Sequence, residues 1–416
     1  MERDYQGNTR SVKESFIAPT GECAMPPMRR VQGRLFRDML DILSHRVVYS
    51  DRRFYASFPS AATLADGRVL VAFRRARDHR WLHGEPAEGG GDFSSVDHVD
   101  SRSHLAIQRF TPDFEPEGAP QSLPADPEAG DQDPNLLVLR SGRIVMGSFG
   151  WYPLSARHGL RLREKGVHLL GNPETSGTFF LFWGGSTRFS DDDGRHWSAH
   201  RYLPELPDQG PILPGLRPML GGAVRGRAVE APDGTLLMAT YTGGPYVSYL
   251  FASRDQGESW TLRSTIARDP EGRAGFCETA LHLTADGQLI AFHRTTGLGD
   301  RLATSVSRDL GESWAPWMEN AVIGHPYDAC PLPDGRLLVV YGYRHEPYGV
   351  RARVWDSRRE TLEDAPEIVI RDDAPSPDVG YPWATVLADG RVAVCYYICD
   401  GAGTRHIQAT LLRVSG

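Results

Sequence analysis

Cysteine is scarce in this sequence, and long apolar runs are missing from it. The chain has five cysteines among 416 residues, without CxxC spacing. Because this number is small and odd, we expect free thiols in a reducing compartment rather than a disulfide framework or a zinc site. No run of about 18 apolar residues occurs, and the first residues lack the apolar core of a secretory signal. These absences predict a cytoplasmic protein that does not contact a membrane.

Charge of one sign is not concentrated in any segment. The net charge is −7 and Lys and Arg form no block, so the basic stripe typical of nucleic-acid-binding proteins is missing. A Gly-rich phosphate loop, a nucleotide fingerprint and the Ser-His-Asp order of acyl-transfer enzymes are missing as well. We therefore expect neither a nucleic-acid partner nor a bound cofactor.

Glycine and proline, by contrast, are abundant. The chain has 44 Gly and 30 Pro along its whole length and 10% aromatic residues, a composition typical of a turn-rich β protein. Its length exceeds what one ordinary hydrophobic core supports. The chain should therefore form several domains or one closed array of repeats.

A motif of the form S-x-D-x-G-x-x-W is present in three intact copies. The copies occupy residues 190–197, 253–260 and 307–314. In a hairpin, Ser and Asp side chains bond nearby backbone N–H groups, Gly supplies a positive φ, and Trp packs beneath the loop. We therefore interpret three aspartates as turn residues rather than catalytic ones: Asp192, Asp255 and Asp309. The motif also predicts three tryptophans buried under equivalent outer hairpins: Trp197, Trp260 and Trp314.

A second repeat consists of two short apolar strands joined by a turn that contains glycine. It occurs six times, with turn glycines at Gly67, Gly142, Gly234, Gly287, Gly335 and Gly390. The spacings between these glycines match one four-stranded blade each, plus insertions. We therefore predict an all-β fold, a six-bladed β-propeller over residues 45–416, whose closure leaves no long sheet edge exposed.

Some segments lie outside the repeats. Residues 1–44 are expected to be an N-terminal extension, partly disordered, with a short helix at 37–43, whereas 45–50 is expected to be the strand that closes the ring. The two widest spacings between turns place insertions at about 80–98 and 151–178. Loops of this length in a compact domain are usually functional.

One position in each repeat is expected to face the central funnel, because the innermost strands of a propeller converge there. Eight residues before each turn Asp, or its equivalent, stand Phe58, Asp133, Arg225, Glu278, Pro326 and Tyr381. Four of these six side chains are acidic, basic or phenolic. This is the composition expected of a pocket with convergent polar groups.

The three motif copies and six strand-turn-strand units resemble the sialidase (neuraminidase) superfamily, in which the motif is called the Asp box. The resemblance implies an exo-glycosidase. Tyr381, in DVGYPWATVLADG, resembles the nucleophilic tyrosine of that family, and Glu278, in CETALHLTADG, resembles the glutamate that takes its proton. A phenol of pKa about 10 is unreactive until a carboxylate activates it. The alternative is a core tyrosine, with the glutamate in a structural ion pair.

The resemblance also implies arginines that hold the substrate carboxylate, a task suited to the guanidinium group. Arg294, in LIAFHRTTG, resembles one of three such arginines. Arg344 and Arg351 compete for the next position, and Arg344 is preferred because it follows its strand as Arg294 does. The third arginine belongs to a Phe-Arg-Ile-Pro motif, where this sequence has Ala-Ser-Phe-Pro with Ser57 in the place of the arginine.

A second departure accompanies the first. The family glutamate that supports the missing arginine is replaced here by Tyr397. Because a lone buried charge is costly, we interpret the two changes as one coordinated loss, and expect Ser57 and Tyr397 to lie close together. Sialic acid itself is then in doubt. Four arginines are candidates to rebuild the clamp, with Arg77 in the best register: Arg74, Arg75, Arg77 and Arg225.

The general acid of the family lies between the first hairpin and the next strand, in a lid that excludes water. Asp100 has the nearest offset to it, and Asp97 and Asp78 are alternatives. Three histidines of the same region fit no common metal spacing: His79, His83 and His98. We expect His98, like Asp133 in the funnel, to contact the substrate rather than a metal.

Together these residues predict retaining hydrolysis of a terminal, acidic sugar, with a glycan or a small sugar as substrate. Two alternatives stay open. One is a propeller lyase or a hydrolase for a non-sialic sugar, which Ser57 and Tyr397 suggest. The other is a non-catalytic glycan-binding propeller.

Overall fold

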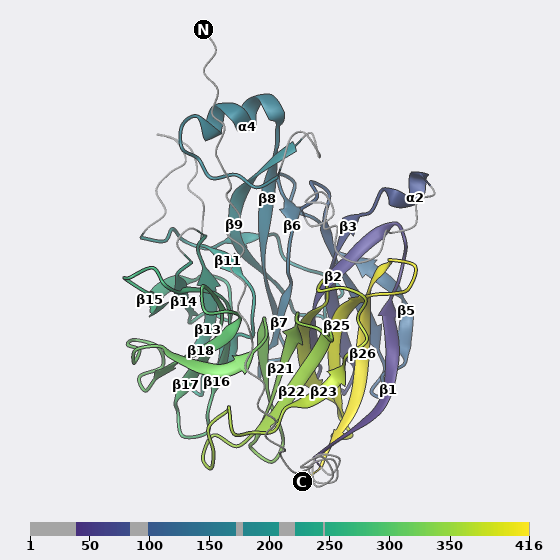
Figure 1. Ribbon diagram of the computed structural model, residues 1–416, viewed down its shortest axis with the longest axis vertical. Coiled ribbons are helices and arrows are strands. Elements are labelled where there is room, and N and C mark those ends of the chain that lie inside the picture. Colours follow the sequence, from purple (N-terminus) through teal and green to yellow (C-terminus); the bar gives the residue numbers. More distant parts are fainter. Residues whose placement is uncertain (1–38, 84–98, 172–177, 208–220, 244–245, 416) are drawn as a thin grey trace, which may run out of the picture.

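The computed structural model describes residues 39–83, 99–171, 178–207, 221–243 and 246–415. Almost all regular structure in them is β, in six antiparallel sheets (Figure 1). The innermost strands of neighbouring blades contact one another, except that the innermost strand β11 of blade three contacts β8 of blade two, and the innermost strand of the last blade contacts that of the first. The predicted six-bladed β-propeller is therefore confirmed.

The first three blades follow one another along the chain. Blade one contains β2 (Phe54–Thr63), β3 (Val69–Arg77), β4 (His104–Phe110) and β5 (Pro116–Ser122). Blade two contains β6 (Gly130–Asp131) and β7 (Asn135–Val138), both paired with β8 (Ile144–Ser155), then β9 (Thr178–Ser190) and β10 (Arg201–Tyr202). Blade three contains β11 (Ala223–Val224) and β12 (Val229–Glu230), both paired with β13 (Leu236–Tyr241), then β14 (Ser248–Ser253) and β15 (Thr261–Ala267).

The other three blades complete the ring. Blade four contains β16 (Gly275–Leu283), β17 (Leu289–Thr296), β18 (Arg301–Ser307) and β19 (Met318–Ile323). Blade five contains β20 (Tyr327–Pro331), β21 (Leu337–Tyr343), β22 (Gly349–Trp355) and β23 (Ile368–Arg371). Blade six contains β24 (Gly380–Val386), β25 (Val392–Cys399), β26 (Arg405–Val414) and β1 (Leu40–Tyr49).

Strand β1 closes the ring, because it pairs antiparallel with β26 and completes blade six. The prediction of a closing strand at 45–50 is confirmed, but the strand begins at Leu40. The expected helix at 37–43 is therefore wrong wherever that segment is described. Pairing with the open edge of β26 outweighs the local preference of these residues. The rest of the predicted extension, residues 1–38, lies outside the described residues.

The turn glycines of the six inner hairpins share one backbone conformation. Their φ angles lie between 85° and 90°, in the left-handed region that favours glycine. Each of these turns joins the first two strands of its blade. The repeat could be recognised in the sequence because this position requires the same residue in every blade.

The three Asp boxes join the third and fourth strands of blades two, three and four. In the second box, Ser253 Oγ donates to Asp255 Oδ1 at 2.8 Å, and the Gly257 N–H donates to Ser253 Oγ at 2.9 Å. The other boxes repeat these contacts. The expected burial of the tryptophans holds for Trp260, whereas Trp197 and Trp314 are half-buried. These two lie at the margin of their apolar clusters, where solvent reaches part of the ring.

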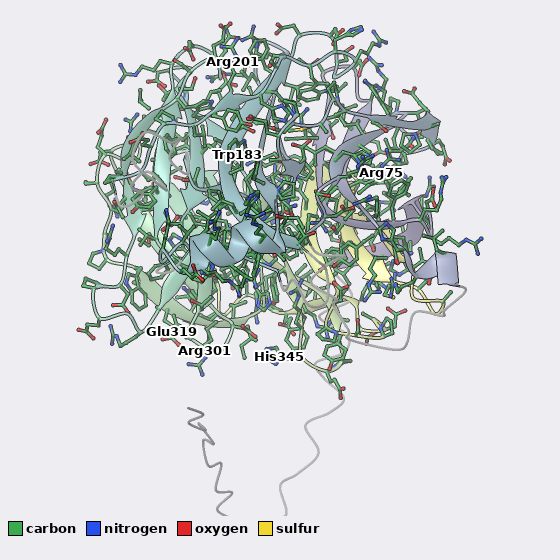
Figure 2. All side chains as sticks on the ribbon, turned by 90° about the horizontal axis from the view of Figure 1, so that it is seen from above. Arg75, Trp183, Arg201, Arg301, Glu319 and His345 are labelled. Atoms are coloured by element: carbon green, nitrogen blue, oxygen red, sulfur yellow. The ribbon has the colours of Figure 1, made fainter. Side chains whose placement is uncertain are left out.

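Both predicted insertions begin with an extra element. In the second one, β8 and β9 continue beyond the blade as a long hairpin that carries helix α4 (Ala156–Arg163), at the top of Figure 1. Seen from above, α4 crosses in front of the ring (Figure 2). The first insertion begins with the short helix α2 (Arg80–His83), and 84–98 lie outside the described residues. Neither helix is long and apolar enough to cross a membrane.

An ion pair between the half-buried Arg227 and the buried Asp328 links three blades. Arg227 follows β11 in blade three, and its Nε and Nη2 donate to the two carboxylate oxygens of Asp328 in blade five at 2.7 and 2.8 Å. In blade six, the Ala384 N–H donates to Asp328 Oδ2 at 2.8 Å. The guanidinium also lies over the Trp383 ring, at 5.0 Å from its centroid. Polar contacts therefore hold opposite sides of the propeller together.

Candidate active site

The innermost strands of five blades are interrupted at the position predicted to face the funnel. In blades one, four and six, β-bulges place Phe58, Glu278 and Tyr381 at φ angles of 55°, 46° and 49°. In blade two the interruption separates β6 from β7, and in blade three it separates β11 from β12. A bulge re-aims the side chain at its centre. A non-glycine residue in this conformation is strained, so the rest of the blade must hold it there.

The interruptions surround a cavity of about 330 Å³. Phe58, Asp133, Glu278 and Tyr381 line it, as their shared offset predicted, whereas Arg225 and Pro326 do not. Eight aromatic side chains contribute to the wall: Phe58, Phe149, Trp151, Phe182, Tyr241, Tyr246, Tyr381 and Tyr397. The cavity therefore combines flat apolar surfaces with a few polar groups, as small-molecule sites do.

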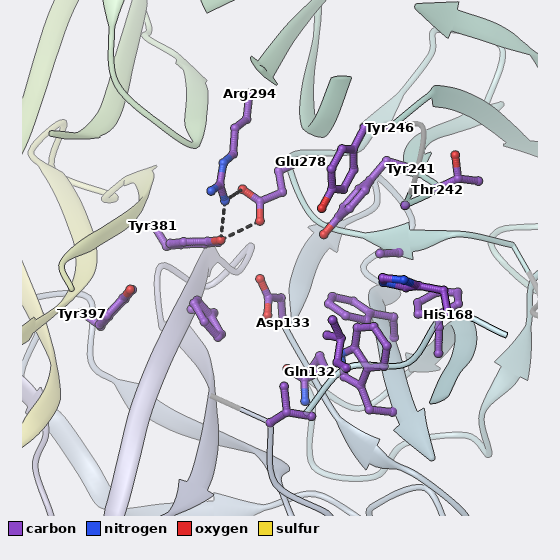
Figure 3. Close-up of a pocket in the computed structure, with 18 of the residues that line it drawn as sticks. Gln132, Asp133, His168, Tyr241, Thr242, Tyr246, Glu278, Arg294, Tyr381 and Tyr397 are labelled. Carbon is purple, nitrogen blue, oxygen red and sulfur yellow. Dashed lines mark hydrogen bonds and ion pairs between the residues drawn. The ribbon is translucent and has the colours of Figure 1, made fainter. Parts of the chain in front are cut away.

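Tyr381, Glu278 and Arg294 form one hydrogen-bonded group in the cavity (Figure 3). The Tyr381 hydroxyl donates to Glu278 Oε1 at 2.6 Å. Arg294 Nη1 donates to Glu278 Oε2 at 2.7 Å and to the Tyr381 hydroxyl oxygen at 2.8 Å. Burial raises the pKa of the Tyr381 phenol well above its usual range, and the charge of Glu278 raises it further. The phenol is therefore neutral at pH 7 and can attack only as its proton passes to a base.

Arg344 supplies a second cation to the cavity. It follows β21 directly, and its Nη2 donates to the Tyr397 hydroxyl at 2.9 Å. Its guanidinium lies 5.4 Å from the centroid of the Tyr381 ring. The competing Arg351 is buried in blade five, where it donates to backbone carbonyls such as that of Pro347 at 3.0 Å. The structure thus brings Arg344, rather than Arg351, to the site.

Asp133 lies in the interruption between β6 and β7 and is 4% exposed. Its nearest cation is Arg225, whose Nε is 3.9 Å from Asp133 Oδ2. Burial raises the pKa of Asp133 to about 7; Arg225 opposes this shift, and Glu278 adds to it. This carboxyl group therefore titrates near neutral pH.

Arg225 does not line the cavity, which corrects its prediction as a substrate-binding residue. Its Nη1 donates to the Pro134 carbonyl at 3.1 Å, and its Nη2 donates to the carbonyls of Pro59 and Tyr381 at 3.2 Å each. Its guanidinium also lies over the Trp383 ring. These contacts join backbone segments of three blades, so Arg225 helps to position the residues that line the cavity without lining it.

Asp100 is placed elsewhere than expected for a general acid. It is not among the residues lining the cavity, and Arg77 Nη2 donates to its Oδ1 at 2.7 Å. The Arg77 N–H donates to its Oδ2, also at 2.7 Å. Although burial favours the neutral acid, hydrogen bonds from Arg77 hold the pKa of Asp100 below its usual value. Asp100 and Arg77 are therefore paired with each other. This pairing supports neither the prediction of Asp100 as the general acid nor that of Arg77 as a carboxylate-binding arginine.

The remaining candidates of the first insertion also lie away from the cavity or outside the described residues. Arg75 donates to His104 Nε2 at 3.1 Å, on the face of β3 opposite to Arg74, so its prediction as a clamp is wrong. Asp78 is paired with Arg80. His79 is exposed, the side chain of His83 is not described, and Asp97 and His98 lie outside the described residues. No group of three metal-ligating side chains occurs in the described part of the chain.

Blade one contributes an aromatic side chain to the funnel beside Ser57. Ser57 is fully buried, and its neighbour Phe58 enters the funnel, with its ring centroid 4.5 Å from Tyr381 and 5.4 Å from Tyr397. Behind Phe58, at 4.7 Å from its ring, lies the guanidinium of Arg74. Blade one therefore contacts Tyr397 through Phe58, and the expected proximity of Ser57 to Tyr397 stays a prediction. Two arginines line the cavity in the described residues, Arg294 and Arg344.

A carboxylate lies behind Tyr397, although none lines the cavity there. Asp378 is fully buried and accepts hydrogen bonds from the Tyr55 hydroxyl at 2.9 Å and from Arg405 Nε at 2.8 Å. Tyr397 packs against the ring of Tyr55, with 6.1 Å between centroids. Asp378 therefore forms its ion pair with Arg405, at 2.8 Å.

Several lining residues were not singled out from the sequence. Trp151 and His168 come from the second insertion, and Phe149 and Phe182 from the long hairpin that carries it. The wide spacing between turns was the signal for this wall. Tyr241 and Tyr246, on either side of the connection between β13 and β14, had no such signal.

Comparisons with known proteins agree with this architecture. The model of the family described as BNR repeat-like domain matches residues 167–394, which is more than half of the chain. The chain belongs to this BNR repeat-like family. No curated protein matches it.

Solved structures resemble the whole propeller. A protein of unknown function from Dyadobacter fermentans is 32% identical over 90% of this chain and 99% of that one, with a TM-score of 0.78. The NanB sialidase from Streptococcus pneumoniae (K499G mutant) is 15% identical over 88% of this chain and 70% of that one, with a TM-score of 0.59. The Trypanosoma rangeli sialidase in complex with the inhibitor DANA is 14% identical over 86% and 55%, with a TM-score of 0.56. The fold is that of sialidases.

Proposed function

We propose that this protein is a retaining exo-glycosidase that removes a terminal, acidic sugar, with Tyr381 as its nucleophile. The observation that carries the proposal is that the Tyr381 phenol contacts both a carboxylate and a guanidinium in the funnel. Tyr381 lies on β24, whereas Glu278 and Arg294 lie on the paired strands β16 and β17. A tyrosine with a purely structural role in the core needs only one hydrogen-bond partner for its hydroxyl, and it needs no open cavity beside it. Tyrosine nucleophiles are known among sialidases.

The geometry supports a double displacement. The Tyr381 oxygen attacks the anomeric carbon while its proton passes to Glu278, 2.6 Å away. The bond to the leaving oxygen breaks as this oxygen takes a proton from a general acid, and a glycosyl-tyrosine forms. Water then attacks the same carbon from the side of the departed group and returns a proton to that acid, while Tyr381 recovers its own proton from Glu278. Two inversions at one carbon give retention.

The substrate carboxylate fits the two arginines that line the cavity. Arg294 and Arg344 approach Tyr381 from neighbouring blades, so their charges surround the point of attack. A neutral phenol can approach a carboxylate-bearing carbon without the repulsion that an attacking carboxylate would meet. Beside these two arginines the wall is formed by the Phe58–Tyr397 pair instead of a third arginine. This favours an acidic sugar whose carboxylate needs two cations, whereas sialic acid receives three in enzymes with three arginines.

A panel of 4-nitrophenyl glycosides, acidic (ulosonic and uronic) and neutral, tests the proposal. We expect release of nitrophenol from an acidic member, and we expect NMR to show the product first in the anomeric configuration of the substrate. Inversion would contradict the nucleophile, and an unsaturated product would favour a lyase. Binding without turnover of any member would favour the glycan-binding alternative.

Replacement of Arg344 by Gln should weaken the acidic glycoside specifically. A hydrogen bond to a charged group contributes about 1.5–3 kcal/mol, so we expect kcat/KM for the acidic substrate to fall roughly 10- to 150-fold. Turnover of a neutral glycoside, where measurable, should change much less. Arg75→Gln is the matched control, because Arg75 pairs with His104 outside the cavity. Equal losses on both substrates would mean that Arg344 acts mainly by holding Tyr397.

A further inference from the structure

We infer that Asp133 is the acid that protonates the leaving oxygen, an assignment that rests on the proposed hydrolysis. Two carboxyl groups line the cavity in the described residues, Glu278 and Asp133. Glu278 is occupied by Tyr381 and Arg294 and serves as the base for the phenol. Asp133 comes from a different blade, and its carboxyl group faces the Tyr381–Glu278 contact across the open cavity (Figure 3).

The contacts of Asp133 differ from those of a structural carboxylate. Arg225 reaches it only at 3.9 Å and directs its Nη donors to backbone carbonyls. Asp100, in contrast, is gripped by the side chain and the backbone N–H of Arg77. A carboxylate fixed in this way gives up its pair of hydrogen bonds if it takes a proton. Asp133 can gain and lose a proton at lower cost.

The charges around Asp133 set its protonation near neutral pH. The charged and titratable groups that act on it, from the elements packed around it, are Arg74, Arg225, Tyr241, Glu278 and Tyr381. Burial is the largest influence and brings the pKa of Asp133 to about 7. Below this pH the group carries the proton that a general acid needs, and above it the proton is lost.

The proposed step balances over the full reaction. As the Tyr381 oxygen bonds to the anomeric carbon, the leaving oxygen takes the proton of Asp133 and departs as an alcohol. The resulting Asp133 carboxylate then takes a proton from the attacking water. The glycosyl-tyrosine bond breaks, Tyr381 regains its proton from Glu278, and both carboxyl groups return to their initial states. One water is consumed for each bond cleaved.

Leaving-group dependence tests the assignment. For the sugar that wild-type enzyme accepts, kcat/KM is measured with a 4-nitrophenyl and with a benzyl or alkyl glycoside. In Asp133→Asn we expect kcat/KM to fall about 10²- to 10⁴-fold for the alkyl glycoside. The nitrophenyl glycoside should lose less than tenfold, because nitrophenolate departs without a proton. Asp100→Asn is the matched control and should change both substrates alike.

The possible results separate the role of Asp133 from the proposed hydrolysis. Equal losses of kcat/KM on both substrates in Asp133→Asn, or a leaving-group effect in Asp100→Asn instead, would overturn the assignment while leaving Tyr381 as nucleophile. If Asp133→Asn does not fold, the wild-type enzyme decides: kcat/KM for the alkyl glycoside should fall as pH rises through about 7, and a flat profile to pH 9 would overturn it. Wild-type enzyme inactive on every glycoside would contradict the proposed function itself.

Discussion

Tyr381→Phe is expected to lower kcat by roughly 10⁴- to 10⁶-fold, the range seen when the nucleophile of an enzyme is removed. The change deletes one oxygen, which contacts Glu278 at 2.6 Å and Arg294 at 2.8 Å. The phenyl ring can keep its packing against Phe58. The measurement is kcat on the accepted glycoside, together with the melting temperature.

The control for this variant is Tyr348→Phe. Tyr348 donates to Glu346 at 3.3 Å on the surface of blade five and does not line the cavity. We expect its activity and its melting temperature to match the wild type. A Tyr381→Phe enzyme that keeps near wild-type turnover would refute the nucleophile, whereas a large drop in melting temperature would show that the hydroxyl acts structurally.

Asp328→Ala should produce the largest loss of stability among substitutions away from the cavity. Removing one partner of a buried ion pair leaves the other charge uncompensated and costs about 3–5 kcal/mol. Arg227 would lose both carboxylate contacts, and the Ala384 N–H would lose its acceptor. Urea denaturation should show a lower midpoint with an unchanged slope.

An exposed ion pair provides the comparison. Glu319 accepts from Arg301 at 2.9 Å at the rim of blade four (Figure 2). Glu319→Gln should change the free energy of unfolding by less than about 0.5 kcal/mol. A loss below 1 kcal/mol for Asp328→Ala would mean that the Arg227–Asp328 pair contributes little and that apolar packing between blades holds the ring.

The blade count was predictable because the turns impose a backbone requirement that few residues meet. Each inner turn needs a left-handed residue, and glycine marks it in all six blades. The closing strand was harder to delimit. Residues 40–43 gain their strand conformation from β26, which is far away in the sequence, so local propensity gave no indication of it.

The site was predictable where a fixed offset met a bulge. Tyr381, Glu278 and Phe58 all stand at the same distance from their turns, and all three have positive φ angles at a β-bulge. The prediction of Arg75 as a carboxylate-binding arginine was wrong because side chains alternate along β3, which turns Arg75 to the face opposite Arg74. The structure does not support Asp100 as the general acid, because Asp100 forms an ion pair with Arg77. That pair depends on the geometry of the loop, which the spacing of residues in the sequence does not indicate.

The pairing of β1 with β26 has a consequence for synthesis on the ribosome. Leu40–Tyr49 precedes the rest of the propeller in the chain and emerges before it, whereas its partner Arg405–Val414 follows the other strands and emerges after them. During elongation the nascent chain must carry an unpaired strand, a known liability for misassociation. Tyr381 belongs to the blade that this pairing completes. Tyr381 therefore reaches its final surroundings only after Arg405–Val414 has been synthesised, and a chain that stalls before that strand lacks the pairing that completes blade six.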